Sequence, residues 1–93
     1  MKAIWNGQTI AESNDTIVVE VNQYFPLSAV KMEFLAKSET PYTCPWKGEC
    51  QYFNVTVDGK ESKDAAFSYP DPKEAAKNIA GYVAFWKDVE VGE

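Results

Sequence analysis

Two dipeptides, Asn6-Gly7 and Asp58-Gly59, constrain the fold of this 93-residue chain more than any other feature. A two-residue hairpin loop needs positive φ at both central positions, which Asn, Asp and Gly tolerate best. Short apolar runs flank the first dipeptide. An alternating segment over residues 49–57 leads directly into the second. The sequence therefore predicts antiparallel hairpins at both places.

Turn signals and short apolar runs predict most of the remaining chain to be strand. Further strands are expected at 16–21, 24–26, 82–86 and 89–91, with 24–26 at a sheet edge because Pro26 ends it. Two short helices are expected, over 29–37 capped by Ser28 and over 72–81 capped by Asp71. The fold class is mainly β (α+β by its two short helices), with two antiparallel sheets in a barrel-like arrangement and a single domain over 1–93.

Alternation also predicts the hydrophobic core. The side chains assigned to it are Ile17, Val19, Phe53, Val55, Val83 and Phe85. Truncating a core ring such as Phe53 or Phe85 should cost about 3–5 kcal/mol.

The charge balance excludes several classes of function. There are 14 acidic and 9 basic residues, all nine of them lysine, and the net charge is −5. Such a chain is not expected to bind nucleic acid.

No apolar run approaches the ~20 residues that span a membrane. A turn at Asn6-Gly7 stands where a secretory signal would be apolar, so we expect a cytoplasmic protein.

The absence of histidine limits the available chemistry. No Ser-His-Asp or Cys-His pair can form within the chain, and two cysteines cannot complete a four-ligand zinc site. We therefore expect no metal and no cofactor. Acid–base chemistry would fall to Lys, Tyr, Cys, Asp or Glu.

The segment Thr43-Cys44-Pro45-Trp46-Lys47-Gly48, followed by Cys50, concentrates the reactive and aromatic side chains. A nearby ammonium lowers a thiol pKa, so Lys47 could activate Cys44. The simpler interpretation is that Cys44 is a small buried side chain, since free cysteine is among the most buried residue types. A Cys44–Cys50 disulfide is a further alternative, disfavoured in a reducing compartment.

Several motifs together resemble the domain of unknown function 427 family. They are Tyr24-Phe25-Pro26, Leu35-x-x-Ser38, the Thr43–Gly48 segment, Tyr52, Ala66-Phe67-Ser68-Tyr69-Pro70-Asp71-Pro72 and Ile79-x-Gly81-Tyr82-Val83-Ala84-Phe85-Trp86. The resemblance implies a β-tent fold, in which two antiparallel sheets lean together, as in methionine sulfoxide reductase B and the ligand-binding domain of cereblon. Some relatives clamp the sheets with four cysteines and zinc, which this chain lacks. A nucleotidyltransferase label attached to the family finds no support, because no glycine-rich phosphate loop is present.

Three functions remain open on this evidence. The preferred one is binding of a small-molecule ligand in an aromatic pocket whose mouth carries Tyr24, Cys44, Trp46, Lys47, Tyr52 and Tyr69. The alternatives are an enzyme that uses Cys44 with Lys47, and a protein-interaction module that presents exposed rings. In the ligand hypothesis, Lys47 keeps its ammonium free for an anionic or carbonyl group. Its truncation should then change stability by about 0.5 kcal/mol or less. The oligomeric state is left open.

Overall fold

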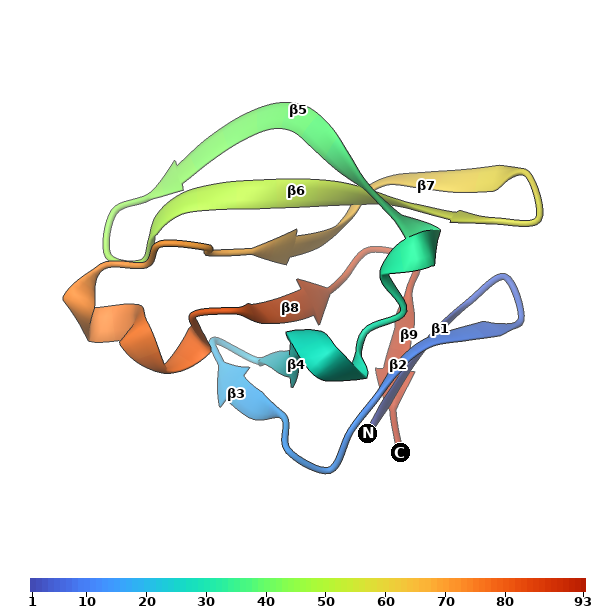
Figure 1. The fold of residues 1–93 in the computed structure, drawn as a ribbon, viewed down its shortest axis with the longest axis horizontal. Coiled ribbons are helices and arrows are strands. Elements are labelled where there is room, and N and C mark those ends of the chain that lie inside the picture. Colours follow the sequence, from blue (N-terminus) through green and yellow to red (C-terminus); the bar gives the residue numbers. More distant parts are fainter.

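Nine strands, all paired antiparallel, form two sheets in the computed structural model, which describes residues 1–93 (Figure 1). The small sheet has the order β2-β1-β9, with bounds Gln8–Glu12, Lys2–Trp5 and Glu90–Gly92. The large sheet has the order β3-β4-β8-β7-β6-β5, with bounds Ile17–Val19, Asn22–Pro26, Tyr82–Phe85, Lys60–Ser68, Gly48–Val57 and Leu35–Cys44. The prediction of a mainly β fold with two antiparallel sheets is confirmed.

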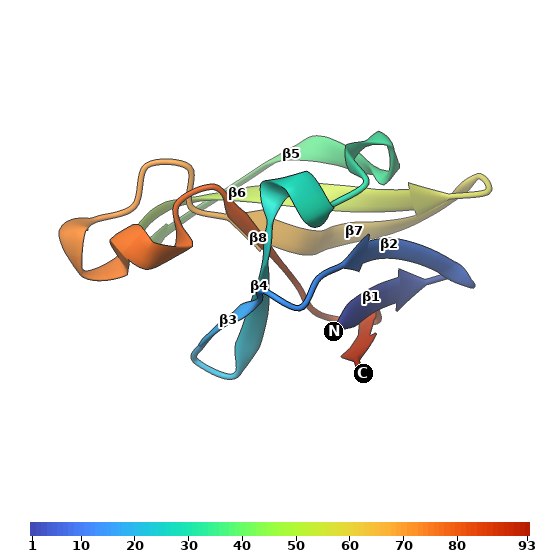
Figure 2. The same cartoon turned by 60° about the horizontal axis from the view of Figure 1, so that its bottom comes forward.

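The sheets remain open. The large sheet begins at β3 and ends at β5, and these two edge strands do not pair, so no barrel closes. Figure 2 shows the small sheet lying across from β6 and β7. No helix of the structure has the length and apolar character needed to cross a membrane.

Neither predicted helix forms as an α-helix. The region 27–37 instead contains two single 3-10 turns, η1 (Leu27–Ala29) and η2 (Met32–Phe34), followed by the start of β5. Neither turn has a side-chain cap. Short isolated helices are marginal, and pairing of ten-residue β5 along β6 outweighs a local cap signal.

The second predicted helix is only a 3-10 segment, η3 (Glu74–Ile79). Its N-cap residue is Lys73 rather than Asp71, with no side-chain cap hydrogen bond. Ala76 has φ −122° and ψ 20°, which interrupts the helical geometry. The segment still buries Ala76 and Ile79, so it covers the sheet as expected for a short helix.

Strand β4 is also not an edge strand as predicted, because β3 pairs with one side of it and β8 with the other. Pro26 is its last residue. The ladder continues past the proline, since the Leu27 N–H donates to the Gly81 carbonyl at 3.1 Å. A proline at the end of an interior strand therefore costs little here.

Three hairpins turn through two residues with positive φ. Asn6-Gly7 (49° and 76°) and Asp58-Gly59 (51° and 77°) confirm the predicted turns. The third turn is Glu20-Val21, with φ 49° and 65°, at the β3–β4 connection. The strand predicted to run through Val21 therefore ends at Val19, and Val21 is 95% exposed.

Buried residues divide between the two faces of the large sheet. The inner cluster faces the small sheet and joins Phe25, Phe53, Val55, Val83 and Phe85 to Ala3 and Ile10. The outer cluster comprises Tyr24, Cys44, Phe67, Tyr69, Ala76, Ile79 and Ala84. Four predicted core residues lie in the inner cluster. Ile17 and Val19 are only partly buried and pack against the outer cluster instead.

Candidate functional site

The outer cluster and the adjoining β5–β6 turn bring the six predicted site residues together from distant parts of the chain. Tyr24 comes from β4, Cys44 from the end of β5 and Tyr69 from just after β7, and all three are buried. Tyr52 of β6 packs against them. The turn between β5 and β6 supplies Trp46 and Lys47. The residues form a packed cluster, so most of them do not surround an open mouth.

Lys47 is buried, contrary to the expectation of a free ammonium, and only 6% of its surface is exposed. Its Nζ lies 5.3 Å from the ring centre of Trp46 and 5.1 Å from that of Tyr69. The same Nζ donates a hydrogen bond to Glu20 Oε1 at 2.6 Å. The aromatic rings and the carboxylate replace the water that a turn lysine would normally keep.

The ion pair holds both groups in their charged forms. Burial alone would lower the pKa of Lys47, but the hydrogen bond with Glu20 and the electrostatic influence of Tyr24 and Glu20 raise it above its usual value. The hydrogen bond and charge of Lys47 in turn lower the pKa of Glu20. At neutral pH the site therefore carries one buried cation and one exposed anion.

The hydroxyl group of Tyr24 lies near the Lys47–Glu20 ion pair and makes no hydrogen bond of its own. The side chain is fully buried, and its hydroxyl has no hydrogen-bond partner. Burial raises the pKa of Tyr24, while the nearby Lys47 charge opposes that rise. A buried hydroxyl without a partner is uncommon, because it gives up its bonds to water.

The two cysteines are free thiols and form no disulfide. Cys44 is buried, 5% exposed, which agrees with the simpler interpretation of it as a small packed side chain. Burial raises the pKa of the Cys50 thiol to about 11. Cys50 is therefore protonated at neutral pH, whereas a nucleophilic cysteine needs a thiolate.

Three further rings enlarge the site, and the sequence analysis missed them. Tyr52 stacks on Trp86, with ring centres 6.2 Å apart and planes 13° from parallel. Tyr42 lies beside Tyr52, and Phe67 meets Tyr52 and Trp86 edge-on. We call the seven rings Tyr24, Tyr42, Trp46, Tyr52, Phe67, Tyr69 and Trp86 the aromatic face. Period-two alternation signals it, since Trp86 follows two residues after Ala84, which pairs with Phe67.

Part of the aromatic face is open to solvent. Tyr42 is 47% exposed, Trp86 40% and Trp46 38%. The indole N–H of Trp86 donates to the Asp64 carbonyl at 2.6 Å, which fixes the ring on the sheet. A rigid sheet thus presents partly exposed rings next to a buried ammonium.

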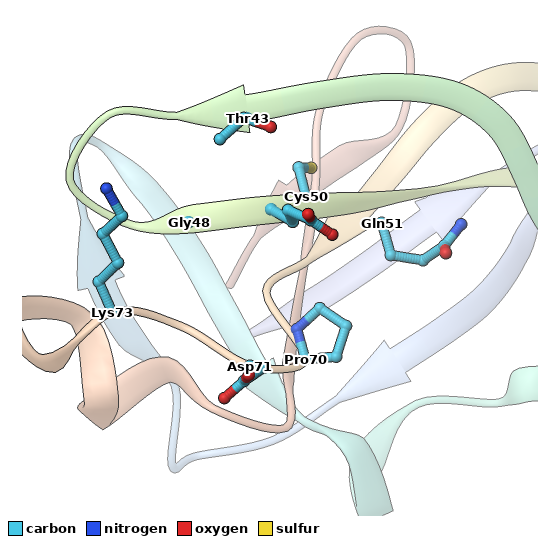
Figure 3. Close-up of a pocket in the computed structure, with 8 residues that line it drawn as sticks. Thr43, Gly48, Cys50, Gln51, Pro70, Asp71 and Lys73 are labelled. Carbon is cyan, nitrogen blue, oxygen red and sulfur yellow. The ribbon is translucent and has the colours of Figure 1, made fainter.

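A separate cleft of about 640 Å³ lies beside the β5–β6 turn (Figure 3). Its lining residues are Thr43, Gly48, Glu49, Cys50, Gln51, Pro70, Asp71 and Lys73. It includes Thr43, Gly48 and Cys50 of the reactive segment, but none of its lining residues has an aromatic ring and none is among the six predicted site residues. Lys73 extends toward the turn and donates to the Pro45 carbonyl at 2.8 Å. This cleft is therefore not the predicted aromatic pocket.

No group of three or more His, Cys, Asp or Glu side chains is placed to hold a metal ion.

The sequence comparisons agree with the motifs described above. No curated protein matches the chain. A family model described as Domain of unknown function (DUF427) matches residues 1–93, the whole chain. The chain therefore belongs to the DUF427 family.

Proposed function

We propose that this domain binds a small ligand whose planar or apolar part lies on the aromatic face beside the Cys44–Gly48 turn. The observation that carries the proposal is the parallel Tyr52–Trp86 pair, with Trp86 held by its indole hydrogen bond yet 40% exposed. Large rings fixed on a rigid sheet offer apolar area with little loss of side-chain freedom. Lys47 lies at the edge of this surface and supplies the polar contact.

Three observations favour a small ligand over other functions. Tyr24 is fully buried, so it cannot serve as an exposed anchor for a protein partner. The Cys50 thiol is protonated and Cys44 is buried, which favours binding over cysteine-based catalysis. The net charge of −5 likewise favours a small molecule over nucleic acid.

The three tryptophans allow a direct test. We would follow the indole N–H signals by two-dimensional NMR while titrating small planar molecules, beginning with benzamide. Trp46 and Trp86 should shift. Trp5, which belongs to the small sheet and donates to Asp88 at 3.0 Å, should not. A Trp86→Leu variant should weaken binding and Trp5→Leu should leave it unchanged.

Equal shifts at all three indoles would mean non-specific contact and would refute the proposal. So would a full set of planar probes that moves neither Trp46 nor Trp86.

A further inference from the structure

The contact between Glu20 and Lys47 joins an exposed group to a buried one. The side chain of Lys47 is 7% exposed, whereas that of Glu20 is 57% exposed. Glu20 covers the ammonium from outside, and no other hydrogen-bond acceptor is bonded to Lys47 Nζ. Displacement of Glu20 would therefore open the ammonium without disturbing the buried rings.

The segment that carries Glu20 is held in an unfavourable conformation. Glu20 and Val21 both have positive φ, at 49° and 65°. A β-branched residue rarely adopts this region, so the backbone at Val21 is strained. Val21 is 95% exposed, so its own packing does not repay the strain. The ion pair joins this turn to Lys47, which lies between the Trp46 and Tyr69 rings of the aromatic face.

The Glu20 carboxylate bonds to Lys47 but leaves the neighbouring Tyr24 hydroxyl without a hydrogen bond. The buried Tyr24 hydroxyl has no hydrogen-bond partner, although Lys47 is close enough to act on its pKa. A carboxylate has two oxygens that accept several hydrogen bonds. A ligand carboxylate entering from the aromatic face could accept from both Lys47 and Tyr24.

We propose that Glu20 occupies the place of a ligand carboxylate at Lys47, and that an aromatic or apolar carboxylic acid displaces it. This rests on the proposed function of the aromatic face and names its ligand class. A carboxylate suits the site better than a phosphate, because one lysine balances one charge and the chain has no arginine to share a second.

Benzoate and benzamide make a matched pair of probes, since they share a ring and differ in charge. Dissociation constants would be measured from the Trp46 indole signal for wild type, Glu20→Gln and Tyr24→Phe. Glu20→Gln should bind benzoate roughly five- to tenfold more tightly, because the internal competitor is gone, and should bind benzamide unchanged. Tyr24→Phe should weaken benzoate alone. Glu12→Gln is the control, as it removes the same charge from an exposed pair with Lys2.

The outcomes separate this inference from the proposed function. Unchanged benzoate affinity in Glu20→Gln, or an equal gain for benzamide, would overturn the inference. If benzamide still shifts Trp46 and Trp86 in those titrations, the ligand-binding function would stand. If neither probe shifts them in any variant, both proposals fail.

Discussion

At the scale of single residues, burial of Lys47 is the feature with the most consequence. The sequence placed this lysine in a turn, where lysine is ordinarily solvated. The structure places its stem and ammonium between Trp46 and Tyr69, with Glu20 as counter-ion. Trp46 is the preceding residue, but Glu20 and Tyr69 come from distant parts of the chain, so no local pattern could reveal the burial of this lysine. Lys47 thus contributes to stability as well as to the proposed site.

Truncation of Lys47 should therefore destabilise the fold. We expect Lys47→Ala to lower the free energy of unfolding by about 1–3 kcal/mol, through lost stem packing and a lost ion pair. Lys47→Met keeps most of the stem and should cost less. Phe53→Ala, at ~3–5 kcal/mol, gives the scale for a core residue. Urea denaturation measures all three, and a Lys47→Ala value within about 0.5 kcal/mol of wild type would contradict the burial argument.

The thiol of Cys50 gives a pH-dependent prediction. Burial raises its pKa to about 11, so the reactive thiolate is scarcer at neutral pH than in free cysteine and increases as pH rises. In a Cys44→Ala variant, the rate of alkylation by iodoacetamide should keep rising through about pH 9–10. Free cysteine under the same conditions is the control, with a rate that levels off above its pKa of ~8.5. A profile for Cys50 that levels off at or below that value would contradict the raised pKa of this thiol.

At the scale of elements, turn chemistry explains which hairpins the sequence could predict. Asn6-Gly7 and Asp58-Gly59 use residues that tolerate positive φ, so their local signal is strong. Glu20-Val21 adopts the same kind of turn with residues that do not. There the conformation is sustained by pairing of β3 with β4 and by contact with Lys47, 27 residues away in sequence. Neither the strand pairing nor the contact with Lys47 can be recognised from the local sequence.

Relief of this strain should stabilise the protein. Val21→Gly removes a β-branched residue from positive φ and loses almost no packing, because Val21 is 95% exposed. We expect a gain of about 1 kcal/mol in the free energy of unfolding. Gly59→Ala is the matched control. It should lower the free energy of unfolding, because alanine tolerates the φ of 77° poorly. No neighbour lies within 4 Å of the added methyl group, so the loss would come from the backbone alone. A loss of stability in Val21→Gly would show that the turn is not strained.

The same competition between local and long-range effects explains the mistaken helices and the missed rings. Ser28 and Asp71 are good caps in isolation, but β5 pairs along β6 and η3 begins at another residue. The motif around Cys44 located most of the site because its members are close in sequence. Alternation puts Trp86 on the same face as Ala84, but its place beside Tyr52 and Phe67 depends on the register of β7 with β8, which no single segment specifies.

At the scale of the whole molecule, the inner cluster connects the two sheets. Ala3 and Ile10 of the small sheet are completely buried against side chains of the large one. The Trp5 indole bonds Asp88, which also accepts from Ser62 of β7. Since neither sheet has a separate inner core, the two should unfold together.

Ile10→Ala tests this coupling. It should cost about 2–5 kcal/mol and shift one cooperative transition rather than split it. Circular dichroism and the fluorescence of a variant that retains only Trp5 would report the backbone and the small sheet separately. Their midpoints should coincide. Ile17→Ala, at a partly buried position, should cost less. Two separated transitions would show that the small sheet is an independent unit.

Pairing of β1 with β9 has a consequence for synthesis of the protein in the cell. Lys2 lies opposite Gly92, and Ile4 opposite Glu90, so the first strand meets a neighbour made almost ninety positions later. At roughly 5–20 residues per second, a ribosome delivers that neighbour several seconds after β1 emerges. During this interval the edge of β1 that later pairs with β9 has no partner strand, and the side chains of the β1–β2 hairpin that the fold later buries are exposed to solvent. Native assembly of the small sheet is therefore a late event, and the nascent chain offers chaperones a defined early target.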